Sequence, residues 1–346
     1  MAKIAINGFG RIGRLFFRQA FGNRKLDIVA INDLGDIENL AYLLKYDSVY
    51  RTYDREVNFK RNAGGSGGEL IVDGKHITVV QEKDATKLPW GKMKIDVVVE
   101  STGIFESYAQ ASVHVKTAGA KKVVITAPAK DDDGVAGGQT ILMGVNEDKF
   151  KTCTISSNGS CTTNATSPVV AVMEEAIGVR KAVLNTVHGY TATQNLTDGP
   201  TRGKDFRRGR AAGVNIVPSS TGAAIAVTRA FENLKDKFDG IAIRIPTITG
   251  SLIDFTFVAK RPTSVEEVNS AFIEASKNKR WKGILAVAPD QFVSSDIIGL
   301  PFASIVDLEY TKVVDNDLVK VLAWYDNEWG YTTTLVSHVI EAGGTV

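Results

Sequence analysis

The chain has 346 residues, of which 44% are hydrophobic and 23% charged, and its formal net charge is +2. These values are typical of a soluble globular protein, and the length exceeds the roughly 100–200 residues of one ordinary domain. The small net charge gives no argument for binding to nucleic acid or to a membrane. No apolar run is long enough to cross a bilayer, and two cysteines cannot form a disulfide framework. The first strand begins next to the initiator Met and leaves no room for a signal peptide, so we expect a cytoplasmic protein.

The first segment predicts a dinucleotide site. Residues 3–7 form an apolar strand, Gly8, Gly10 and Gly13 follow as G-x-G-x-x-G, and an apolar-periodic helix comes next. Glycines let the backbone approach a pyrophosphate, which sits on the N-terminus of the helix. A second strand, residues 27–32, ends at Asp33, about twenty residues past the last glycine. A carboxylate there accepts a hydrogen bond from a ribose 2′-hydroxyl and repels a 2′-phosphate, which predicts NAD rather than NADP.

Helices and strands continue to alternate as far as residue 145. The predicted elements are a helix at 37–46, a hairpin with turns at 64–68 and 73–74, strands at 95–100, 122–126 and 140–145, and a helix at 108–118. This alternation predicts an α/β domain with a mostly parallel, doubly wound Rossmann sheet. Thr102, Gly103 and Thr126 follow strands of this sheet, at the edge where such sheets bind ligands.

Cys161 lies at a predicted junction between a strand and a helix. Residues 154–156 end a strand, and residues 169–177 are apolar at helical spacing. The start of a helix supplies positive potential that lowers the pKa of a thiol. A reactive thiolate and a small buried apolar side chain are both consistent with this position, since free cysteines are usually buried.

Beyond residue 155 the pattern changes to runs of strand. The predicted strands are residues 181–188, 241–245, 252–259, 305–310 and 318–324, and the predicted helices are residues 221–233, 264–279 and 330–341. Asp315-Asn316 is a hairpin turn, so this α+β catalytic domain should contain a mostly antiparallel sheet. We place the boundary of the NAD-binding domain at 1–159, completed by a C-terminal helix at 326–346, and the catalytic domain at 160–325.

The four histidines do not pair with each other or with cysteine at the spacing of a zinc site, so we predict no metal. His188 ends an apolar strand and opens a loop. Such a histidine is often structural, but with Cys161 it would provide the imidazole that activates a thiol.

These motifs together resemble the phosphorylating glyceraldehyde-3-phosphate dehydrogenases. The resemblance runs from the opening glycine motif to Trp324-Tyr325-Asp326-Asn327-Glu328-Trp329-Gly330-Tyr331 and covers nearly the full chain. Its most specific stretches are Ser160-Cys161-Thr162-Thr163-Asn164, Thr186-Val187-His188-Gly189-Tyr190-Thr191, Pro218-Ser219-Ser220-Thr221-Gly222-Ala223-Ala224 and Ser304-Ile305-Val306-Asp307. Departures from the family pattern are Ala165-Thr166-Ser167 after the active-site Asn, Gly189 after the His, and a loop near residue 202 that is one residue longer.

The resemblance implies a reaction through a thioester. Cys161 attacks the aldehyde carbon, and His188 pairs with the thiolate and then takes the hydroxyl proton as hydride leaves for NAD. The Cys161 backbone N–H stabilises the oxyanion. The implied substrates are glyceraldehyde 3-phosphate and inorganic phosphate.

The resemblance also implies two anion pockets. Thr191 and Arg244 belong to the pocket for the substrate phosphate, and Ser160, Thr162, Arg208, Thr221 and Gly222 to the pocket for the attacking phosphate. Arginine suits both because it binds phosphate through two hydrogen bonds. For Arg244 the other interpretation is a surface charge at a strand edge, which its apolar neighbours disfavour.

Further implied cofactor contacts come from both ends of the chain. Arg11 and Ile12 cover the pyrophosphate, Lys83 lies near the adenine, Asn327 holds the carboxamide of the nicotinamide, and Tyr331 packs against it.

The basic loop, residues 201–210, contains Arg202, Lys204, Arg207, Arg208 and Arg210. It lacks the interleaved aromatic residues of a nucleic-acid site apart from Phe206. The resemblance implies instead a contact with the neighbouring subunit of a homotetramer. Two alternatives for the function remain open: an erythrose-4-phosphate dehydrogenase, and a non-catalytic dinucleotide- or RNA-binding protein on the same fold.

Overall fold

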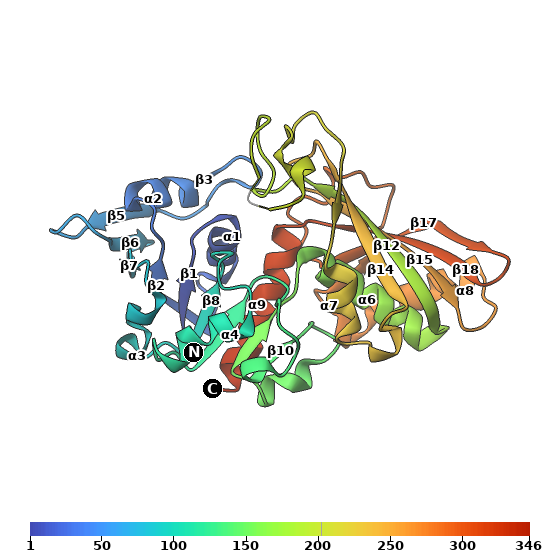
Figure 1. Ribbon diagram of the computed structural model, residues 1–346, viewed down its shortest axis with the longest axis horizontal. Helices are drawn as coiled ribbons and strands as arrows, with labels where there is room; N and C mark the ends of the chain where they lie inside the picture. The colour runs from blue at the N-terminus through green and yellow to red at the C-terminus, as the bar shows by residue number, and fades with distance from the viewer. Residues whose placement is uncertain (202) are drawn as a thin grey trace. The chain divides into compact units, whose positions relative to one another are not determined.

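The computed structural model describes residues 1–201 and 203–346, so Arg202 lies outside the described residues. The chain folds into two compact units (Figure 1). Unit 1 comprises residues 1–141, 146–159 and 335–346, and unit 2 comprises residues 142–145 and 160–334. The predicted α/β class is confirmed. In the described part of the chain, no helix combines the length and apolar character needed to cross a membrane.

Unit 1 is built on a nine-stranded sheet in the order β10-β11-β9-β8-β1-β2-β7-β6-β5, counted over the described residues. Its strands are β1 (Ala2–Asn7), β2 (Leu26–Asn32), β5 (Val57–Arg61), β6 (Gly68–Val72), β7 (Lys75–Val80), β8 (Val97–Glu100), β9 (Lys122–Ile125), β10 (Gly138–Thr140) and β11 (Ile155–Ser157). The strands from β10 to β7 pair in parallel, and β6 and β5 add antiparallel pairs at one edge. Two short strands, β3 (Tyr46–Asp47) and β4 (Arg51–Thr52), pair separately. The chain leaves β1 toward β2 on one side and returns to β8 on the other, so the strand order reverses between β1 and β8.

The helical segments of unit 1 are short. They are α1 (Arg11–Ala20), α2 (Ile37–Lys45), α3 (Trp90–Met93), α4 (Tyr108–Ala111), α5 (Val113–Lys116), and the 3-10 segments η1 (Ala85–Lys87), η2 (Val135–Gly137) and η3 (Glu147–Lys151). Buried Ala5, Val98 and Val123 point from one face of the sheet toward Trp90 and Tyr108. Side chains alternate between the two faces of a strand, so the neighbours of these residues point to the opposite face.

Two predicted elements of the first half differ from the structure. In place of the predicted strand at 140–145 the structure has β10, which ends at Thr140, and Gly144 has a φ of 79° that is not compatible with a strand. The predicted helix at 108–118 is interrupted at Ser112, whose hydroxyl donates to the Ala109 carbonyl at 2.7 Å. Serine competes for backbone hydrogen bonds in this way inside helices.

Unit 2 contains a second sheet, seven-stranded over the described residues, in the order β13-β14-β12-β15-β18-β17-β16. Its strands are β12 (Val179–Gly189), β13 (Val217–Ser220), β14 (Phe238–Ile245), β15 (Ser251–Ala259), β16 (Leu285–Val287), β17 (Ser304–Val314) and β18 (Leu318–Tyr325). Most neighbours are antiparallel, and β12 with β14 and β16 with β17 are parallel pairs. Asp315 and Asn316 both have positive φ in the turn from β17 to β18, which confirms the predicted hairpin.

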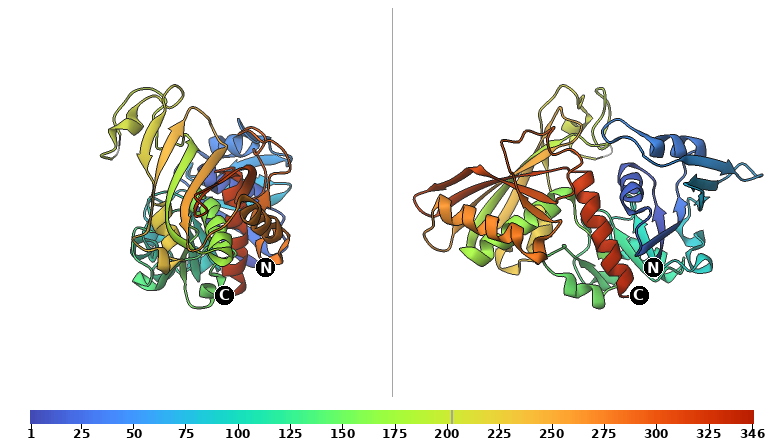
Figure 2. Two further views of the ribbon diagram at one scale, coloured as in Figure 1. Left: turned by 90° about the vertical axis from the view of Figure 1, so that its right-hand side faces the viewer. Right: turned by 180° about the vertical axis from the view of Figure 1, so that it is seen from behind.

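Helices α6 (Cys161–Ala176), α7 (Ala223–Thr228) and α8 (Val265–Lys277) cover one face of the second sheet (Figure 2). The 3-10 segments η4 (Phe206–Gly209), η5 (Glu232–Leu234) and η6 (Lys279–Trp281) complete the unit, and α9 (Trp329–Gly344) closes the chain. The predicted helix at 221–233 is divided into α7 and η5. Along β12, Leu184, Thr186 and His188 are buried, whereas Val183 is 62% exposed. One face of the strand is therefore packed against other elements, and the other face is open to solvent.

Candidate active site

Cys161 is the first residue of α6, as its position in the sequence predicts. Ser160 caps the helix, because its hydroxyl accepts from the Thr163 backbone N–H at 3.0 Å. The Cys161 side chain is half-buried. The thiol therefore lies at the N-terminus of a sixteen-residue helix and still faces solvent in part.

His188 lies beside this thiol. Its Nε2 atom is 3.3 Å from the Cys161 sulfur, although 27 residues separate them in the chain. The strand β12 directs the ring there, because Thr186 and His188 share its buried face with α6. The structure thus brings the predicted nucleophile and the predicted base within hydrogen-bonding distance.

Arg244 joins the pair through the register of two parallel strands. His188 on β12 pairs directly with Arg244 on β14, so their side chains lie next to each other on one face. The Arg244 Nη1 atom is 2.6 Å from His188 Nδ1 and 3.2 Å from the Gly189 carbonyl. The same Nδ1 lies 2.6 Å from that carbonyl. Arg244 is half-buried, which excludes the interpretation of a surface charge.

Tyr325 supports the site and was not singled out from the sequence. Its hydroxyl lies 3.0 Å from the Thr162 hydroxyl on α6 and 2.7 Å from the Thr186 hydroxyl on β12. Its ring meets the edge of the His188 ring at 5.9 Å between centroids. Tyr325 therefore ties the helix of Cys161 to the strand of His188. The alternation of side chains along β18 identifies Tyr325 as an inward side chain, but it does not identify the hydrogen-bond partners of its hydroxyl.

The electrostatics of the pair differ from the expectation for an isolated helix start. Burial raises the pKa of the Cys161 thiol, an effect that the positive charge of Arg244 only reduces. Burial and Arg244 together lower the pKa of His188 to about 3. Both shifts favour a neutral thiol beside a neutral imidazole. In this structure burial therefore opposes the lowering of the thiol pKa that the start of the helix favours.

Arg208 and Thr191 meet near a second group of hydroxyls. The Arg208 guanidinium donates to the Ser219 hydroxyl at 2.5 and 2.9 Å and to the Thr193 hydroxyl at 3.3 Å. Thr193 in turn lies 2.9 Å from the Thr191 hydroxyl. The two predicted anion pockets are therefore connected through the turn at residues 191–193.

The remaining phosphate candidates flank short elements. Ser160 and Thr162 begin α6, and Thr162 is buried against Tyr325. Thr221 accepts from the Ala223 backbone N–H at 3.2 Å, and the exposed Gly222 precedes α7.

The predicted cofactor residues of unit 1 gather at the carboxyl ends of the parallel strands. The two carboxylate oxygens of Asp33 accept from the backbone N–H groups of Phe9 and Gly35, at 2.7 and 2.8 Å. Asp33 thereby holds the glycine loop that follows β1 against the end of β2. Ser101, after β8, donates to the Gly8 carbonyl at 2.7 Å. The loop lies where the strand order reverses, which is the position of ligand sites in open parallel sheets.

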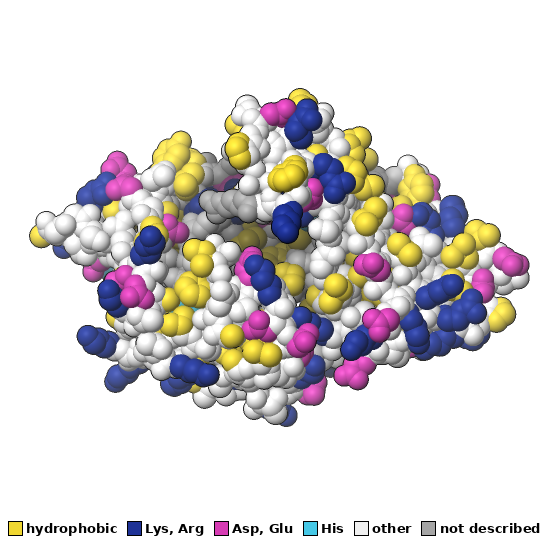
Figure 3. All heavy atoms as spheres, in the orientation of Figure 1, with side chains coloured by type: hydrophobic (Ala, Val, Ile, Leu, Met, Phe, Trp, Pro, Cys, Tyr) yellow, Lys and Arg dark blue, Asp and Glu magenta, His cyan; other side chains and the backbone are white. Residues whose placement is uncertain are grey.

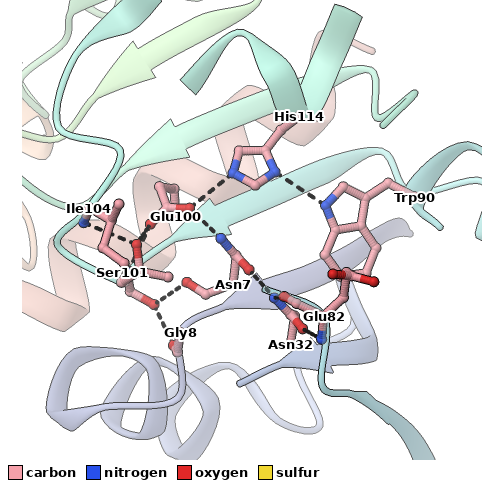
Figure 4. A network of polar contacts seen from close by, with 10 residues as sticks. Asn7, Gly8, Asn32, Glu82, Trp90, Glu100, Ser101, Ile104 and His114 are labelled. Atoms are coloured by element: carbon pink, nitrogen blue, oxygen red, sulfur yellow. Dashed lines mark hydrogen bonds and ion pairs between the residues drawn. The ribbon is translucent and has the colours of Figure 1, made fainter. Parts of the chain in front are cut away.

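A buried polar network lies beneath these strand ends (Figure 4). Glu100 is 2% exposed, and its carboxylate accepts from Asn7 Nδ2 at 2.5 Å, from the Thr102 N–H at 2.8 Å and from the Thr102 hydroxyl. His114 Nε2 lies 2.9 Å from the same carboxylate, and its Nδ1 accepts from the Trp90 indole N–H at 3.3 Å. The indole only donates, so His114 carries its proton on Nε2 and donates to Glu100.

The network continues into the second strand. Asn32 donates to the Asn7 side-chain oxygen at 2.7 Å and to the Glu82 carbonyl at 3.0 Å, and accepts from the Glu82 N–H at 2.9 Å. The network thus joins Asn7, which ends β1 before the glycine loop, to Thr102 and to the backbone of Glu82. Glu100 and His114 had no signal in the sequence, because only the strand order brings them together.

The other predicted cofactor residues are placed as follows. The Arg11 guanidinium pairs with Asp47, and Ile12 lies in the first turn of α1. Lys83 is exposed. The Thr126 N–H donates to the Glu100 carbonyl at 3.0 Å. Asn327 and Tyr331 belong to unit 2 and are buried. The Asn327 side-chain oxygen accepts from the hydroxyls of Ser251 and Thr249 at 2.8 and 3.2 Å and from the Gly250 N–H at 3.2 Å.

In the described part of the basic loop, three arginines contact carboxylates. Asp205 contacts Arg207 and Arg208, and Asp198 contacts Arg210. Charges of both signs are also interspersed over the face shown in Figure 3. These contacts do not favour a nucleic-acid site. Among the described residues, no group of three or more His, Cys, Asp or Glu is arranged to hold a metal ion.

The parallel sheet with its glycine loop, together with the second unit, defines the class of dinucleotide-dependent dehydrogenases. Residues 2–108 match the family described as glyceraldehyde 3-phosphate dehydrogenase, NAD binding domain, and residues 160–327 match its C-terminal domain. The chain belongs to the glyceraldehyde-3-phosphate dehydrogenase family, whose cofactor is NAD.

Three curated relatives illustrate the similarity. The glyceraldehyde-3-phosphate dehydrogenase of Borreliella burgdorferi is 45% identical, with 96% of this chain and 97% of the relative covered. That of Streptomyces coelicolor is 44% identical, with coverage of 99% and 98%. Glyceraldehyde-3-phosphate dehydrogenase 1 of Bacillus subtilis is 45% identical, with 96% of each chain covered.

Proposed function

We propose that this protein oxidises D-glyceraldehyde 3-phosphate to 1,3-bisphosphoglycerate with NAD and inorganic phosphate, as a step of glycolysis and gluconeogenesis. The observation that carries the proposal is the 3.3 Å approach of Cys161 Sγ to His188 Nε2 beside the Arg244 guanidinium. Family membership and the names of the relatives support the three-carbon substrate and do not favour erythrose 4-phosphate. A non-catalytic dinucleotide- or RNA-binding protein would have no use for this arrangement of side chains.

The glycine loop of unit 1 fits a dinucleotide. A Cβ at Gly8 would meet the Thr102 nitrogen at 2.6 Å, and a Cβ at Gly13 would meet the Gly8 carbonyl at 2.2 Å, so larger residues cannot form this turn. A Cβ at Gly10 would meet no atom within 4 Å, so the space above the loop is open to a pyrophosphate. The residues proposed to hold NAD are Gly8, Gly10, Arg11, Ile12, Gly13, Asp33, Lys83, Thr102, Gly103, Thr126, Asn327 and Tyr331. When bound, NAD supplies the acceptor for the hydride.

The proposed chemistry uses Cys161 and His188 as a pair. As the Cys161 sulfur adds to the aldehyde carbon, the thiol proton passes to His188 Nε2, and His188 returns it to the former aldehyde oxygen to give the thiohemiacetal hydroxyl. His188 then accepts the hydroxyl proton as the hydride leaves, which gives a thioester. Inorganic phosphate attacks the carbonyl carbon, the carbon–sulfur bond breaks, and Cys161 leaves as a thiolate. The Cys161 backbone N–H, at the start of α6, would stabilise the oxyanion.

The anions are proposed to bind on either side of this pair. Arg244 and Thr191 would hold the substrate phosphate. Ser160, Thr162, Arg208, Thr221 and Gly222 would hold the attacking phosphate. The contacts of Arg208 with Ser219 and Thr193 support this assignment, because they orient a guanidinium among hydroxyl groups.

We propose a cytoplasmic homotetramer with an NAD-binding domain at 1–159, completed by 326–346, and a catalytic domain at 160–325. Exposed apolar side chains on unit 2 support assembly: Val183 on β12 is 62% exposed, Ile241 on β14 is 52%, and Leu196 and Phe206 in the loop after β12 are 87% and 78%. Val183 and Ile241 lie on paired neighbouring strands, and exposed apolar surface of this kind is typical of a subunit interface. Sedimentation equilibrium measures the mass directly, and a monomer at assay concentration would contradict the tetramer.

A direct assay tests the activity. NADH formation from glyceraldehyde 3-phosphate should require both NAD and inorganic phosphate, and should be more efficient than with erythrose 4-phosphate. His188→Asn should lower kcat by about 10²–10⁴-fold, the usual effect of removing a general base, with little change in NAD affinity. A larger kcat/KM for the four-carbon aldehyde, or turnover that ignores phosphate, would overturn the proposed reaction.

A further inference from the structure

The side-chain amide of Asn327 is held by donors on its oxygen. The Oδ1 atom lies 3.2 Å from the Gly250 backbone nitrogen and 2.8 Å from the Ser251 hydroxyl. A backbone N–H only donates, so the amide atom that faces Gly250 is the oxygen and not the Nδ2 group. An amide oxygen has two lone pairs, and these two donors use both. The Nδ2 group, which only donates, is therefore the part of the side chain left for a ligand.

The direction of the Ser251 hydroxyl is also fixed. Ser251 is 1% exposed at the start of β15, and its oxygen accepts from the Gly189 backbone N–H at 3.1 Å. A hydroxyl has one proton, and it cannot donate that proton to an N–H. The Asn327 oxygen at 2.8 Å is the acceptor for it. The hydroxyl thus links the residue that follows His188 to the residue proposed to hold the carboxamide of the nicotinamide.

Thr249 is a weaker partner of the same oxygen. Its hydroxyl lies 3.2 Å from Asn327 Oδ1, but it also lies 3.1 Å from a carboxylate oxygen of Asp326. A single proton is shared between the two acceptors, and the charged carboxylate is the stronger one. Asp326 is itself fixed, because the same oxygen accepts from two backbone N–H groups at the start of α9, each at 2.9 Å. Without the Ser251 hydroxyl, the Gly250 N–H would be the one full donor that orients the amide.

We propose that Ser251 is a positioning residue for the cofactor: its hydroxyl, held by the Gly189 N–H, keeps the Asn327 amide turned so that Nδ2 donates to the carboxamide oxygen of NAD. The inference rests on the proposed function, in which Asn327 holds that carboxamide. Because Ser251 is buried, it acts on the cofactor through Asn327 and not by contact. Asn327 then recognises the oxygen of the carboxamide and not its amino group.

Two analogues of NAD test the orientation of Asn327 in the wild-type protein. The acetylpyridine analogue keeps the carbonyl oxygen and has a methyl group in place of the amino group. The thionicotinamide analogue keeps the amino group and has sulfur, a weaker acceptor, in place of the oxygen. Calorimetric titration should show tighter binding of the acetylpyridine analogue by about 2- to 12-fold, which is the contribution of one hydrogen bond. Equal binding of the two analogues, or tighter binding of the thionicotinamide analogue, would overturn the proposal.

A variant and a matched control separate Ser251 from the fold around it. Ser251→Ala should weaken NAD binding by about 2- to 12-fold and leave the affinity for ADP-ribose, which has no nicotinamide, unchanged. Ser304 is a buried serine of the same sheet, and its hydroxyl has no hydrogen-bond partner among the described residues. Ser304→Ala should change neither affinity. If Ser251→Ala weakens NAD and ADP-ribose alike, or weakens neither, the positioning role is wrong.

A double-mutant cycle tests whether Ser251 acts through Asn327. In the Asn327→Ala background, Ser251→Ala should cause no further loss of NAD affinity, because the side chain that Ser251 positions is absent. Additive losses would show that Ser251 acts by another route and would overturn the proposal. The comparison of the two analogues in the wild type decides the question if a variant folds poorly.

Failure of the positioning role is distinguishable from failure of the proposed function. Oxidation of glyceraldehyde 3-phosphate that depends on NAD and phosphate, together with equal binding of the two analogues, would refute the role of Ser251 and leave the function intact. Tighter binding of the acetylpyridine analogue without any oxidation of the aldehyde would refute the proposed function and leave the role of Ser251 in cofactor binding intact.

Discussion

Replacing Glu100 with Gln tests the buried network beneath the cofactor loops. The carboxylate of Glu100 accepts from Asn7, from the N–H and hydroxyl of Thr102, and from His114, so every neighbour is a donor. A glutamine presents one oxygen and one amide NH₂. Whichever way the amide turns, its N–H groups face donors. Asn7 and His114 cannot reverse their roles, because Asn32 and Trp90 hold their other atoms.

The cost follows from these contacts. A hydrogen bond to a charged group contributes about 1.5–3 kcal/mol, and a buried donor without a partner costs about 1–3 kcal/mol. Glu100→Gln loses the charge at four contacts and leaves at least one donor unpaired, so we expect about 3–5 kcal/mol of destabilisation. The Gly8 and Thr102 loops should also shift, which weakens NAD binding about tenfold or more, equivalent to roughly 1.4 kcal/mol.

Urea unfolding followed by far-UV circular dichroism measures the stability, and fluorescence titration measures NAD affinity. Glu106→Gln is the matched control, because Glu106 pairs with Lys130 at the surface, where such a pair contributes at most about 1 kcal/mol. The network argument is refuted if Glu100→Gln and Glu106→Gln have the same midpoint and the same NAD affinity as the wild type.

Four further outcomes are expected. Iodoacetamide should label half-buried Cys161 faster than buried Cys153. The labelling rate of Cys161 should still rise above pH 9, because burial raises the pKa of the thiol. A rate independent of pH between 6 and 10 would indicate that the thiol is already ionised. The wild type should prefer NAD over NADP by at least about tenfold in kcat/KM, and Asp33→Gly should narrow this preference, chiefly by weakening the binding of NAD. Equal kcat/KM for both cofactors in the wild type would contradict the role of this carboxylate. Arg208→Ala should lower the efficiency of inorganic phosphate by about 10- to 150-fold and spare the initial burst of NADH; loss of the burst would move Arg208 to the aldehyde step. Burial lowers the pKa of His338 to about 3, against about 6.5 in the unfolded chain. Between these two pH values only the unfolded chain binds the proton, so the free energy of unfolding falls as the pH falls, by up to about 1.4 kcal/mol per pH unit. His338→Gln should reduce this dependence on pH, and an unchanged dependence would show that His338 is not its source.

Most elements could be predicted from local patterns. The glycine loop and α1 follow from G-x-G-x-x-G between an apolar strand and an apolar-periodic helix, and the turn at Asp315-Asn316 follows from residues that tolerate positive φ. The misplaced boundaries have local causes that periodicity does not record. Ser112 bonds to the backbone inside a predicted helix, and Gly144 turns the chain within a predicted strand.

Some residues of the candidate site could likewise be predicted from the sequence, and others could not. Cys161 at the start of α6 and His188 near the end of β12 are visible in the sequence, because each depends on where one element begins or ends. Tyr325 and Glu100 are not, because their hydrogen-bond partners come from strands and helices remote in the chain.

The sequence by itself determined the α/β class, the dinucleotide loop with its Asp33, the residue types of a thiol dehydrogenase and the family to which they belong. These features depend on composition, periodicity and turn chemistry over a few residues. Only the tertiary structure decided that Arg244 contacts His188, since that requires the parallel register of β12 and β14 across 56 residues. Only the tertiary structure decided the burial of the pair as well. The positive potential at a helix start is a local property, whereas burial, which here raises the pKa of Cys161 and lowers that of His188, is set by everything packed around them.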